Sequence, residues 1–204
     1  MTTRALHGVG RGAIGGVVAC ALVLAAALAS PAGAEIVTGL RPAEPQPAAQ
    51  QLAPGLAVQY TYAIVNHVDA LKGRKFEDGP PLPTLDYRTG YGKVMTSKAN
   101  EGVGALITGF ILLEKAGTYG FEVTSNDGVR VEIGGKLLHE DPGVHPDSTS
   151  DRIDVKVDRP GWYPIAIVYF QKRGTATLVV RWIGPGQTSK FGPVPAITLA
   201  HLRK

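Results

Sequence analysis

Alternation of apolar and polar side chains is the strongest pattern in this chain, and it dominates the stretch from Gly117 to Gly186. Residues 129–133 read Val-Arg-Val-Glu-Ile, and residues 153–158 read Ile-Asp-Val-Lys-Val-Asp. A period of two places the apolar side chains on one face of a β-strand, whereas a helix would need them three or four positions apart. The pattern therefore predicts an all-β fold.

Turn residues divide the chain into short segments. We expect strands near residues 56–64, 104–114, 118–125, 129–133, 136–140, 151–158, 162–171, 176–183 and 195–202. Gly134 and Gly135 suit a two-residue hairpin turn, because glycine accepts positive φ at both positions. Gly174-Thr175 is expected in a second hairpin. Short strands separated by turns at this density predict an antiparallel β-sandwich or barrel.

The segment from Tyr163 to Phe170 is apolar on both faces, which predicts a central strand buried between two layers. Pro164 has no amide hydrogen to donate, so it should mark the first residues of that strand or a bulge. The aromatic residues at strand positions are expected in the core. These are Trp162, Trp182, Tyr169 and Phe170.

The stretch from Leu71 to Gly102 is rich in Gly, Pro, Lys and Asp and poor in aliphatic residues. A structureless loop of this length is unusual inside a compact domain, so it should carry a function or contain short strands. Tyr87 and Tyr91, with Leu85, are expected to tether it.

The N-terminus has the features of a cleaved signal peptide over residues 1–34. Arg4 and Arg11 accompany an apolar run from Ala13 to Leu28, and Ala32-Gly33-Ala34 offers small residues to a signal peptidase. An uncleaved anchor is the alternative, because the run approaches the roughly 18 residues that can span a bilayer. The single cysteine, Cys20, lies inside the apolar run, so the processed chain would contain no disulfide.

Residues 35–54 follow as a linker rich in Pro, Ala and Gln, and one domain is expected over residues 55–202. Loss of Arg4 and Arg11 would leave 19 basic and 17 acidic side chains, a net charge of +2. Because the basic residues are scattered along the sequence, they do not indicate a basic patch that would bind nucleic acid or anionic lipid. After signal cleavage we therefore expect no membrane insertion and no nucleic-acid partner.

An ordered series of aromatic and turn residues runs through the alternating stretch. It comprises Tyr119, Phe121, Ser125-Asn126-Asp127-Gly128, Tyr163-Pro164-Ile165, Tyr169 and Trp182. The series resembles the PA14 (PA-fourteen) domain, which is named after anthrax-toxin protective antigen and occurs in fungal adhesins and as inserts in bacterial glycosidases. Gly55–Tyr60 and Val103–Tyr119 extend the resemblance, so that it covers about Leu52 to Leu202. It implies an antiparallel β-sandwich of the PA14 type.

The turn Ser125–Gly128 is the site that the resemblance singles out. In lectin-like members, two adjacent aspartates joined by a cis peptide bind a calcium ion that also holds sugar hydroxyls. Asp127 matches the second of these acids, and Asn126 replaces the first. A calcium site at Asn126 and Asp127 is one interpretation. A purely structural turn is the other, because Asn-Asp-Gly is also what a tight strand connection prefers.

Three further residues are candidate ligand contacts. Gln187 lies in a second candidate loop, Gly184–Phe191, which contains no acid, and Tyr87 and Tyr91 lie in the long loop. A cluster of polar residues between two strands fits no zinc pattern and is interpreted as surface or framework. It comprises His139, Glu140, Asp141, His145 and Asp147.

Taken together, the residues and the resemblance predict an exported, non-catalytic binding module that recognises a glycan or cell-envelope polysaccharide, with calcium as its candidate cofactor. The alternative is a structural or protein-interaction module of the cell envelope. Secretion, or retention in the periplasm or cell envelope, follows from the predicted signal peptide.

We expect the exported protein to begin at Glu35, because the apolar run and Ala32-Gly33-Ala34 direct cleavage after Ala34. N-terminal sequencing of protein recovered from outside the cytoplasm checks this expectation. A first residue of Met1, or a lipid on Cys20, would contradict a soluble, secreted product.

Overall fold

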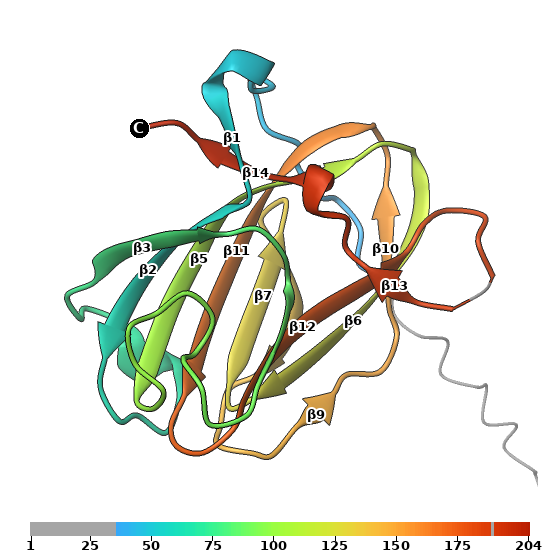
Figure 1. Ribbon diagram of the computed structural model, residues 1–204. Coiled ribbons are helices and arrows are strands. Elements are labelled where there is room, and N and C mark those ends of the chain that lie inside the picture. The colour runs from blue at the N-terminus through green and yellow to red at the C-terminus, as the bar shows by residue number, and fades with distance from the viewer. Residues whose placement is uncertain (1–35, 189) are drawn as a thin grey trace, which may run out of the picture. The chain divides into compact units, whose positions relative to one another are not determined.

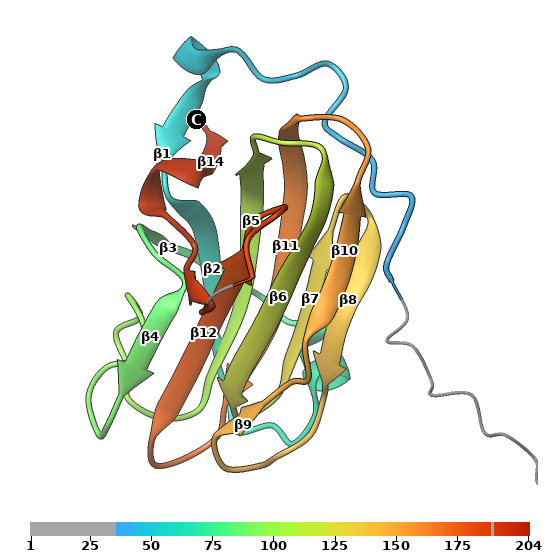
Figure 2. The ribbon, with the colours of Figure 1, turned by 90° about the vertical axis from the view of Figure 1, so that its right-hand side faces the viewer.

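Two antiparallel β-sheets face each other across an apolar core (Figures 1 and 2). The structure is a computed structural model that describes residues 36–188 and 190–204. The predicted signal peptide therefore lies outside the described residues. No helix in the described part of the chain is long and apolar enough to cross a membrane.

The larger sheet has eight strands, with β1, β14, β5, β11, β7 and β8 in that spatial order, while β2 pairs with β5 and β3 pairs with β2. Their bounds are β1 Leu52–Pro54, β2 Leu56–Tyr62, β3 Glu77–Leu82, β5 Val103–Leu113, β7 Val129–Ile133, β8 Lys136–Asp141, β11 Gly161–Gln171 and β14 Leu199–Leu202.

The smaller sheet has six strands in the order β10, β6, β12 and β13, while β4 pairs with β12 and β9 pairs with β6. Their bounds are β4 Asp86–Thr89, β6 Gly117–Asn126, β9 Ser148–Thr149, β10 Ile153–Val157, β12 Ala176–Ile183 and β13 Gly192–Pro193. Three short 3₁₀ helices complete the described elements: η1 Ala49–Gln51, η2 Val68–Leu71 and η3 Ala196–Thr198.

The all-β, antiparallel prediction is confirmed, and so is the hairpin at Gly134-Gly135, where φ is +58° and +72°. The stretch from Leu71 to Gly102 contains β3 and β4, as its length suggested. The strand expected over residues 195–202 is shorter than predicted. It begins as η3 and becomes a strand only at Leu199, after two prolines that cannot donate to a ladder.

Two predictions about β11 and the connection that follows it are wrong. Gly174-Thr175 does not close a hairpin, because β11 pairs with β5 and β7 in the larger sheet whereas β12 belongs to the smaller sheet. β11 is central in its sheet, but only its inner face is buried along most of the strand, whereas its outer face is buried only at Phe170. Pro164 is exposed, and Ala166 and Val168 are only partly buried on the outer face. Pro164 lies just before the pairing with β7 begins, as expected for a residue that cannot donate.

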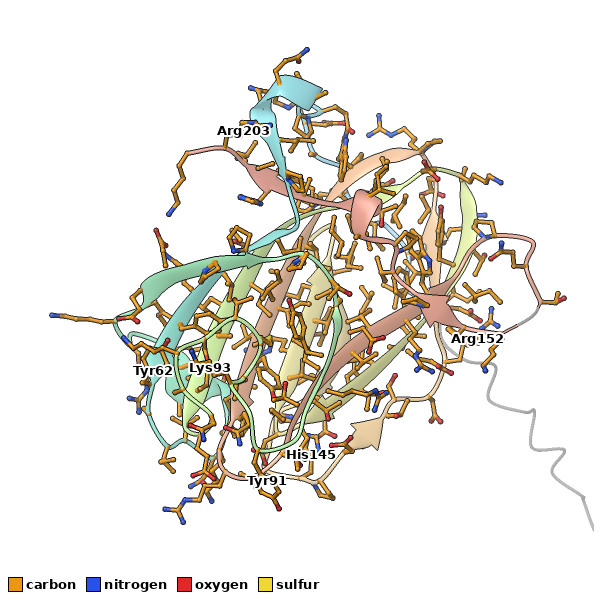
Figure 3. The ribbon with its side chains drawn as sticks, viewed as in Figure 1. Tyr62, Tyr91, Lys93, His145, Arg152 and Arg203 are labelled. Atoms are coloured by element: carbon orange, nitrogen blue, oxygen red, sulfur yellow. The ribbon has the colours of Figure 1, made fainter. Side chains whose placement is uncertain are left out.

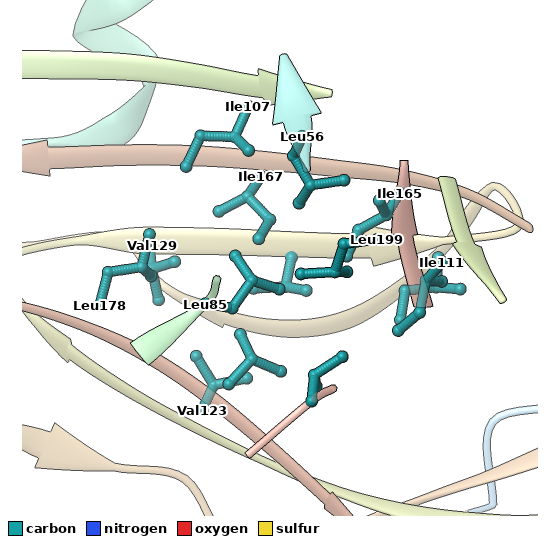
Figure 4. Packing of buried hydrophobic residues seen from close by; sticks show 14 of the residues in the cluster. Leu56, Leu85, Ile107, Ile111, Val123, Val129, Ile165, Ile167, Leu178 and Leu199 are labelled. Carbon is teal, nitrogen blue, oxygen red and sulfur yellow. The ribbon is translucent and has the colours of Figure 1, made fainter. Parts of the chain in front are cut away.

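The core is formed by the inward residues of both sheets, as the close view of Leu56, Ile107, Val123 and Leu178 shows (Figure 4). Tyr169 is fully buried in this core. Phe170 points to the opposite face, where it forms a second small cluster with residues around η2. Trp182 is only partly buried, although its ring centroid lies 5.5 Å from that of Tyr119.

Residues 36–48, which the sequence assigns to a linker, form no helix or multi-residue strand, yet hydrogen bonds join them to both sheets. The amide of Val37 donates to the Asp154 carbonyl at 2.8 Å, and the amide of Ala43 donates to the Trp162 carbonyl at 2.8 Å. The Gln46 side chain accepts from the Trp162 amide at 2.7 Å and donates to its carbonyl at 3.0 Å. Gly161 has a φ of +147°, which residues with a side chain rarely adopt, and a side chain there would also displace the Gln46 amide.

We expect Gln46→Ala to lower the free energy of unfolding by about 1–2 kcal/mol, because it removes hydrogen bonds that fasten the segment to the start of β11. Urea unfolding followed by tryptophan fluorescence measures this loss. Gln50→Ala is the matched control, since Gln50 is an exposed glutamine of η1 and its loss should change stability by less than about 0.5 kcal/mol. Equal effects of the two substitutions would show that the segment is not fastened in this way.

Tyr169→Ala should destabilise the fold by about 3–5 kcal/mol, because it empties a fully buried position. Tyr169→Phe should cost about 1–3 kcal/mol, since it removes only the hydroxyl that donates to the Asn126 carbonyl at 2.5 Å. Trp182→Ala should cost roughly 2 kcal/mol, because that ring is partly exposed. Chemical denaturation gives all three values. Unchanged stability in either alanine variant would contradict a role in the core.

Candidate functional site

The turn Ser125–Gly128 lies where the inner strand β6 ends, at the edge of the smaller sheet that is formed by the ends of its strands. The peptide bond between Asn126 and Asp127 is cis. The Tyr169 hydroxyl, which comes from the larger sheet, donates to the Asn126 carbonyl at 2.5 Å, and the Phe170 amide donates to the Gly128 carbonyl at 3.0 Å. Burial raises the pKa of Tyr169, so this hydroxyl remains a donor at physiological pH. The turn is therefore fixed to both sheets.

Four polar residues form a row across the smaller sheet at this turn. Asn126 pairs with Thr177 of β12, and Thr177 pairs with Arg88 of β4. On the other side of β6, Ser125 pairs with Ser148 of β9, which places Asp147 opposite Asn126. Paired residues of adjacent strands share one face of a sheet. The row Asp147, Asn126, Thr177 and Arg88 therefore lies on the outer face, and we call it the polar row.

Hydrogen bonds connect the members of the polar row. The Asn126 Nδ2 donates to Asp147 Oδ1 at 3.1 Å and to Thr175 Oγ1 at 3.1 Å. The Thr177 hydroxyl donates to Asp147 Oδ2 at 3.0 Å, and Arg88 Nη1 lies 3.8 Å from the same oxygen. Both carboxylate oxygens of Asp147 thus have a protein partner.

The Asp127 side chain points to the connection between β11 and β12. Its Oδ2 accepts from the Lys172 amide at 2.7 Å, and the residue is almost completely buried. The same connection is held from the other side by Glu101, whose Oε1 accepts from the Gly174 amide at 3.0 Å. Asp127 therefore acts here as a cap for the inter-sheet connection, a role in which a carboxylate satisfies an otherwise unpaired amide.

The two tyrosines predicted as ligand contacts lie near this edge but differ in exposure. Tyr87, on β4, packs against the core, and burial raises its pKa to about 12. Tyr91 follows β4, whose last residue, Thr89, pairs with Ala176 next to the polar row. Its side chain is 82% exposed (Figure 3), so it does not tether the loop as predicted. Tyr87 and Leu85 do, because both pack in or against the core. Tyr91 is available to a ligand.

Gln187 lies at the opposite end of β12. Thr177 pairs with Asn126, and Ile183 pairs with Gly120 six residues later. At about 3.3 Å per residue, the loop after Ile183 begins roughly 20 Å from the turn. The structure therefore separates Gln187 from Asn126 and Asp127. The loops that do meet the turn are residues 142–149 and 172–175.

The histidine-containing cluster is divided by the structure. Glu140 forms an ion pair with Arg130, and His145 Nε2 lies 3.3 Å from Asp141 Oδ2. Burial lowers the pKa of His139, which keeps that ring neutral. Asp147 alone leaves the cluster and joins the polar row. Within residues 36–188 and 190–204, no group of three or more His, Cys, Asp or Glu side chains is arranged to hold a metal ion.

Calcium requires six to eight oxygen ligands and usually several carboxylates. The turn provides Asp127, one oxygen of which is already bound to the Lys172 amide, and the neutral amide of Asn126. Asp147 is the nearest additional acid, but the Arg88 guanidinium, 3.8 Å from its Oδ2, would repel a cation, and its other partners, Asn126 and Thr177, are neutral. These residues do not fit a calcium ion.

The sequence pattern singled out Asn126 and Asp127 but missed the roles of Asp147 and Arg88. Asp147 lies 21 residues from Asn126, and only the two-residue strand β9 brings it into place. Such a short strand has no periodicity that a sequence can reveal. Asp147 and Arg88 are each 48% exposed at the side chain, so both present polar atoms to solvent above the buried Asn126 and Thr177.

Comparison with known families finds the PA14 domain at residues 83–191, more than half of the 204-residue chain. No curated protein matches. Solved structures that resemble the fold include the PA14 domain of the MpAFP antifreeze protein, with 18% identity, a TM-score of 0.61 and coverage of 76% of this chain and 93% of that one.

Two sugar-binding proteins also share the fold. The PA14 sugar-binding domain from an RTX adhesin has 20% identity and a TM-score of 0.56, and the match covers 73% of this chain and 99% of that domain. The A domain of epithelial adhesin 9 from Candida glabrata, solved in complex with Galβ1-4GlcNAc, has 12% identity and a TM-score of 0.61, with 83% and 97% covered. The fold is thus shared at low identity, and because the family match spans more than half of its length, this chain belongs to the PA14 domain family.

Proposed function

We propose that this chain is an exported, non-catalytic module that binds a glycan at the edge of the smaller sheet formed by the polar row and Tyr91. The observation that carries the proposal is the arrangement of this edge. A rigid, hydrogen-bonded base holds a half-exposed carboxylate, a half-exposed guanidinium and an exposed aromatic ring. Sugars present hydroxyl groups and apolar ring faces, which such groups bind.

The similar structures support this choice of ligand class. One is described as a sugar-binding domain, and the adhesin domain was solved with Galβ1-4GlcNAc. A related adhesin domain was solved with β-lactose. At such low sequence identity the similarity extends to the fold and not to the sugar specificity, so these sugars serve as first probes. A location outside the cytoplasm, in the periplasm or at the cell envelope, is part of the same proposal and depends on the predicted signal peptide.

The alternative, a structural or protein-interaction module of the envelope, is favoured by one observation. A groove of about 570 Å³ crosses the outer face of the larger sheet, over strands β2, β5, β11 and β7. Its floor includes Ala57, Thr108 and Ala166, which are neighbours in the register, and Phe110, Pro164 and Leu202 border it. An apolar groove of this kind is more typical of contact with an apolar surface than with a sugar.

Titration calorimetry with lactose and with Galβ1-4GlcNAc tests the proposal, supported by a glycan array for other sugars. Tyr91→Ala should weaken binding about tenfold, since the exposed ring would stack on the sugar and each factor of ten corresponds to about 1.4 kcal/mol. Ile197→Ala is the matched control, because Ile197 is equally exposed but lies on η3. It should leave the affinity unchanged.

Absence of binding to every glycan on the array, with and without added calcium, would contradict the proposal and favour the structural alternative. Equal losses of affinity in the Tyr91 and Ile197 variants would place the ligand elsewhere on the domain.

A further inference from the structure

The polar row avoids the charge repulsion that two adjacent acids at this turn would cause. Two acids next to each other at the end of β6 would repel unless a cation lay between them. In this chain the first position is Asn126, whose amide group carries two donors and no charge. Both donors are used, one on Asp147 and one on Thr175. The turn therefore needs no ion to neutralise it.

The acid that the turn lacks comes from another loop. Asp147 immediately precedes β9, and the pairing of Ser148 with Ser125 fixes its carboxylate beside Asn126. Thr177 binds the second carboxylate oxygen from the opposite side of β6. Arg88 lies on β4, two strands from β6, and provides the compensating positive charge, with its Nη1 3.8 Å from Asp147 Oδ2. Asp147 thus connects β9, β6, β12 and β4 through direct contacts.

We propose that the site of this chain works without calcium, because Asp147 holds the Asn126-Asp127 turn directly and Arg88 supplies the positive charge. Asp147 is a positioning residue for the turn. The second step of the proposal rests on the proposed glycan binding. In it, Asp147 and Arg88 contact the hydroxyl groups of the sugar directly, with no bridging ion. Each carboxylate oxygen has two lone-pair directions, and the protein uses one on each. The others are free to accept from a pair of neighbouring sugar hydroxyls, and the guanidinium can donate to them.

Thermal unfolding with and without 10 mM calcium, in the parent and in two variants, tests the metal-free turn independently of any sugar. The parent melting temperature should not change with calcium or with chelator. Asn126→Asp should melt lower than the parent in chelator, because it places a second carboxylate about 3 Å from Asp147. That variant should gain roughly 3–8 °C with calcium if its affinity reaches the ~0.1–1 mM range of extracellular sites.

Asp147→Asn provides the second measurement, which does not depend on creating a new site. It should lower the parent melting temperature by several degrees, since it removes the charge that Asn126, Thr177 and Arg88 share. Glu122→Gln is the matched control, because Glu122 points to the same face of β6 four residues away from Asn126. It should have little effect. A parent that gains stability from calcium and loses that gain in Asp147→Asn would overturn the proposal, because Asp127 and Asp147 would then form a metal site.

Binding measurements on the same variants test the ligand contacts. In a parent that binds a galactoside, chelator should leave the affinity unchanged, and Arg88→Gln should weaken it at least fivefold. Arg181→Gln, on the same face of β12 but paired with Glu122, should not. Binding that disappears in chelator would contradict the proposal. A parent that binds no glycan would contradict the proposed function, and the calcium melts would still decide whether the turn is metal-free.

Discussion

The hydrogen bond from the Tyr169 hydroxyl to the Asn126 carbonyl is the contact on which the site depends. Tyr169 belongs to β11 of the larger sheet, and Asn126 is the last residue of β6 in the smaller one. Both residues are buried, so loss of this bond would leave polar atoms poorly satisfied next to an apolar core. The bond fixes the backbone of the turn relative to both sheets. Because their backbone is fixed, the side chains of Asn126 and Asp127 are also held in defined positions.

From this fixed turn, the remaining contacts spread in two directions. Asp127 secures the Lys172 amide and therefore the connection that carries the chain from β11 to β12. Asn126 secures Asp147, and with it the loop between β8 and β10. Two connections, one of which contains only the two-residue strand β9, are thus held by side chains of one turn. This arrangement leaves the outer atoms of Asp147 and Arg88 in defined positions although both residues are half-exposed.

Periodicity and turn chemistry were sufficient to predict the fold class and most of the strands. Residues 129–133 and 176–183 became strands with the predicted bounds, because alternation is a local property of the sequence. The assignment of strands to sheets is not local. Gly174-Thr175 has the composition of a hairpin, yet it joins different sheets, since the partners of β11 and β12 lie far away in sequence.

The same limit explains what was missed at the site. Asn126 and Asp127 could be singled out because they are adjacent and Asp127 matches the second acid of the pair found in lectin-like family members. Asp147 and Arg88 reach them only through β9 and β4, and the ranges of two and four residues give too little pattern to predict a strand or its register. Gln187 was a candidate ligand contact by its chemistry alone. The register of β12 puts it at the other end.

Replacement of an acid by an amide at position 126 changes the character of the whole row. Two carboxylates about 3 Å apart would repel by about 5 kcal/mol at an effective dielectric constant of 20, a repulsion that a shared proton or a bound cation would have to relieve. The amide at this distance instead donates to Asp147. Donors and acceptors then alternate from Thr175 through Asn126 and Asp147 to Thr177 and Arg88, and each hydrogen bond strengthens the placement of the next. A row of this kind carries no unpaired charge, so in the proposed glycan site the atoms that hold the turn would also be the atoms that contact the sugar.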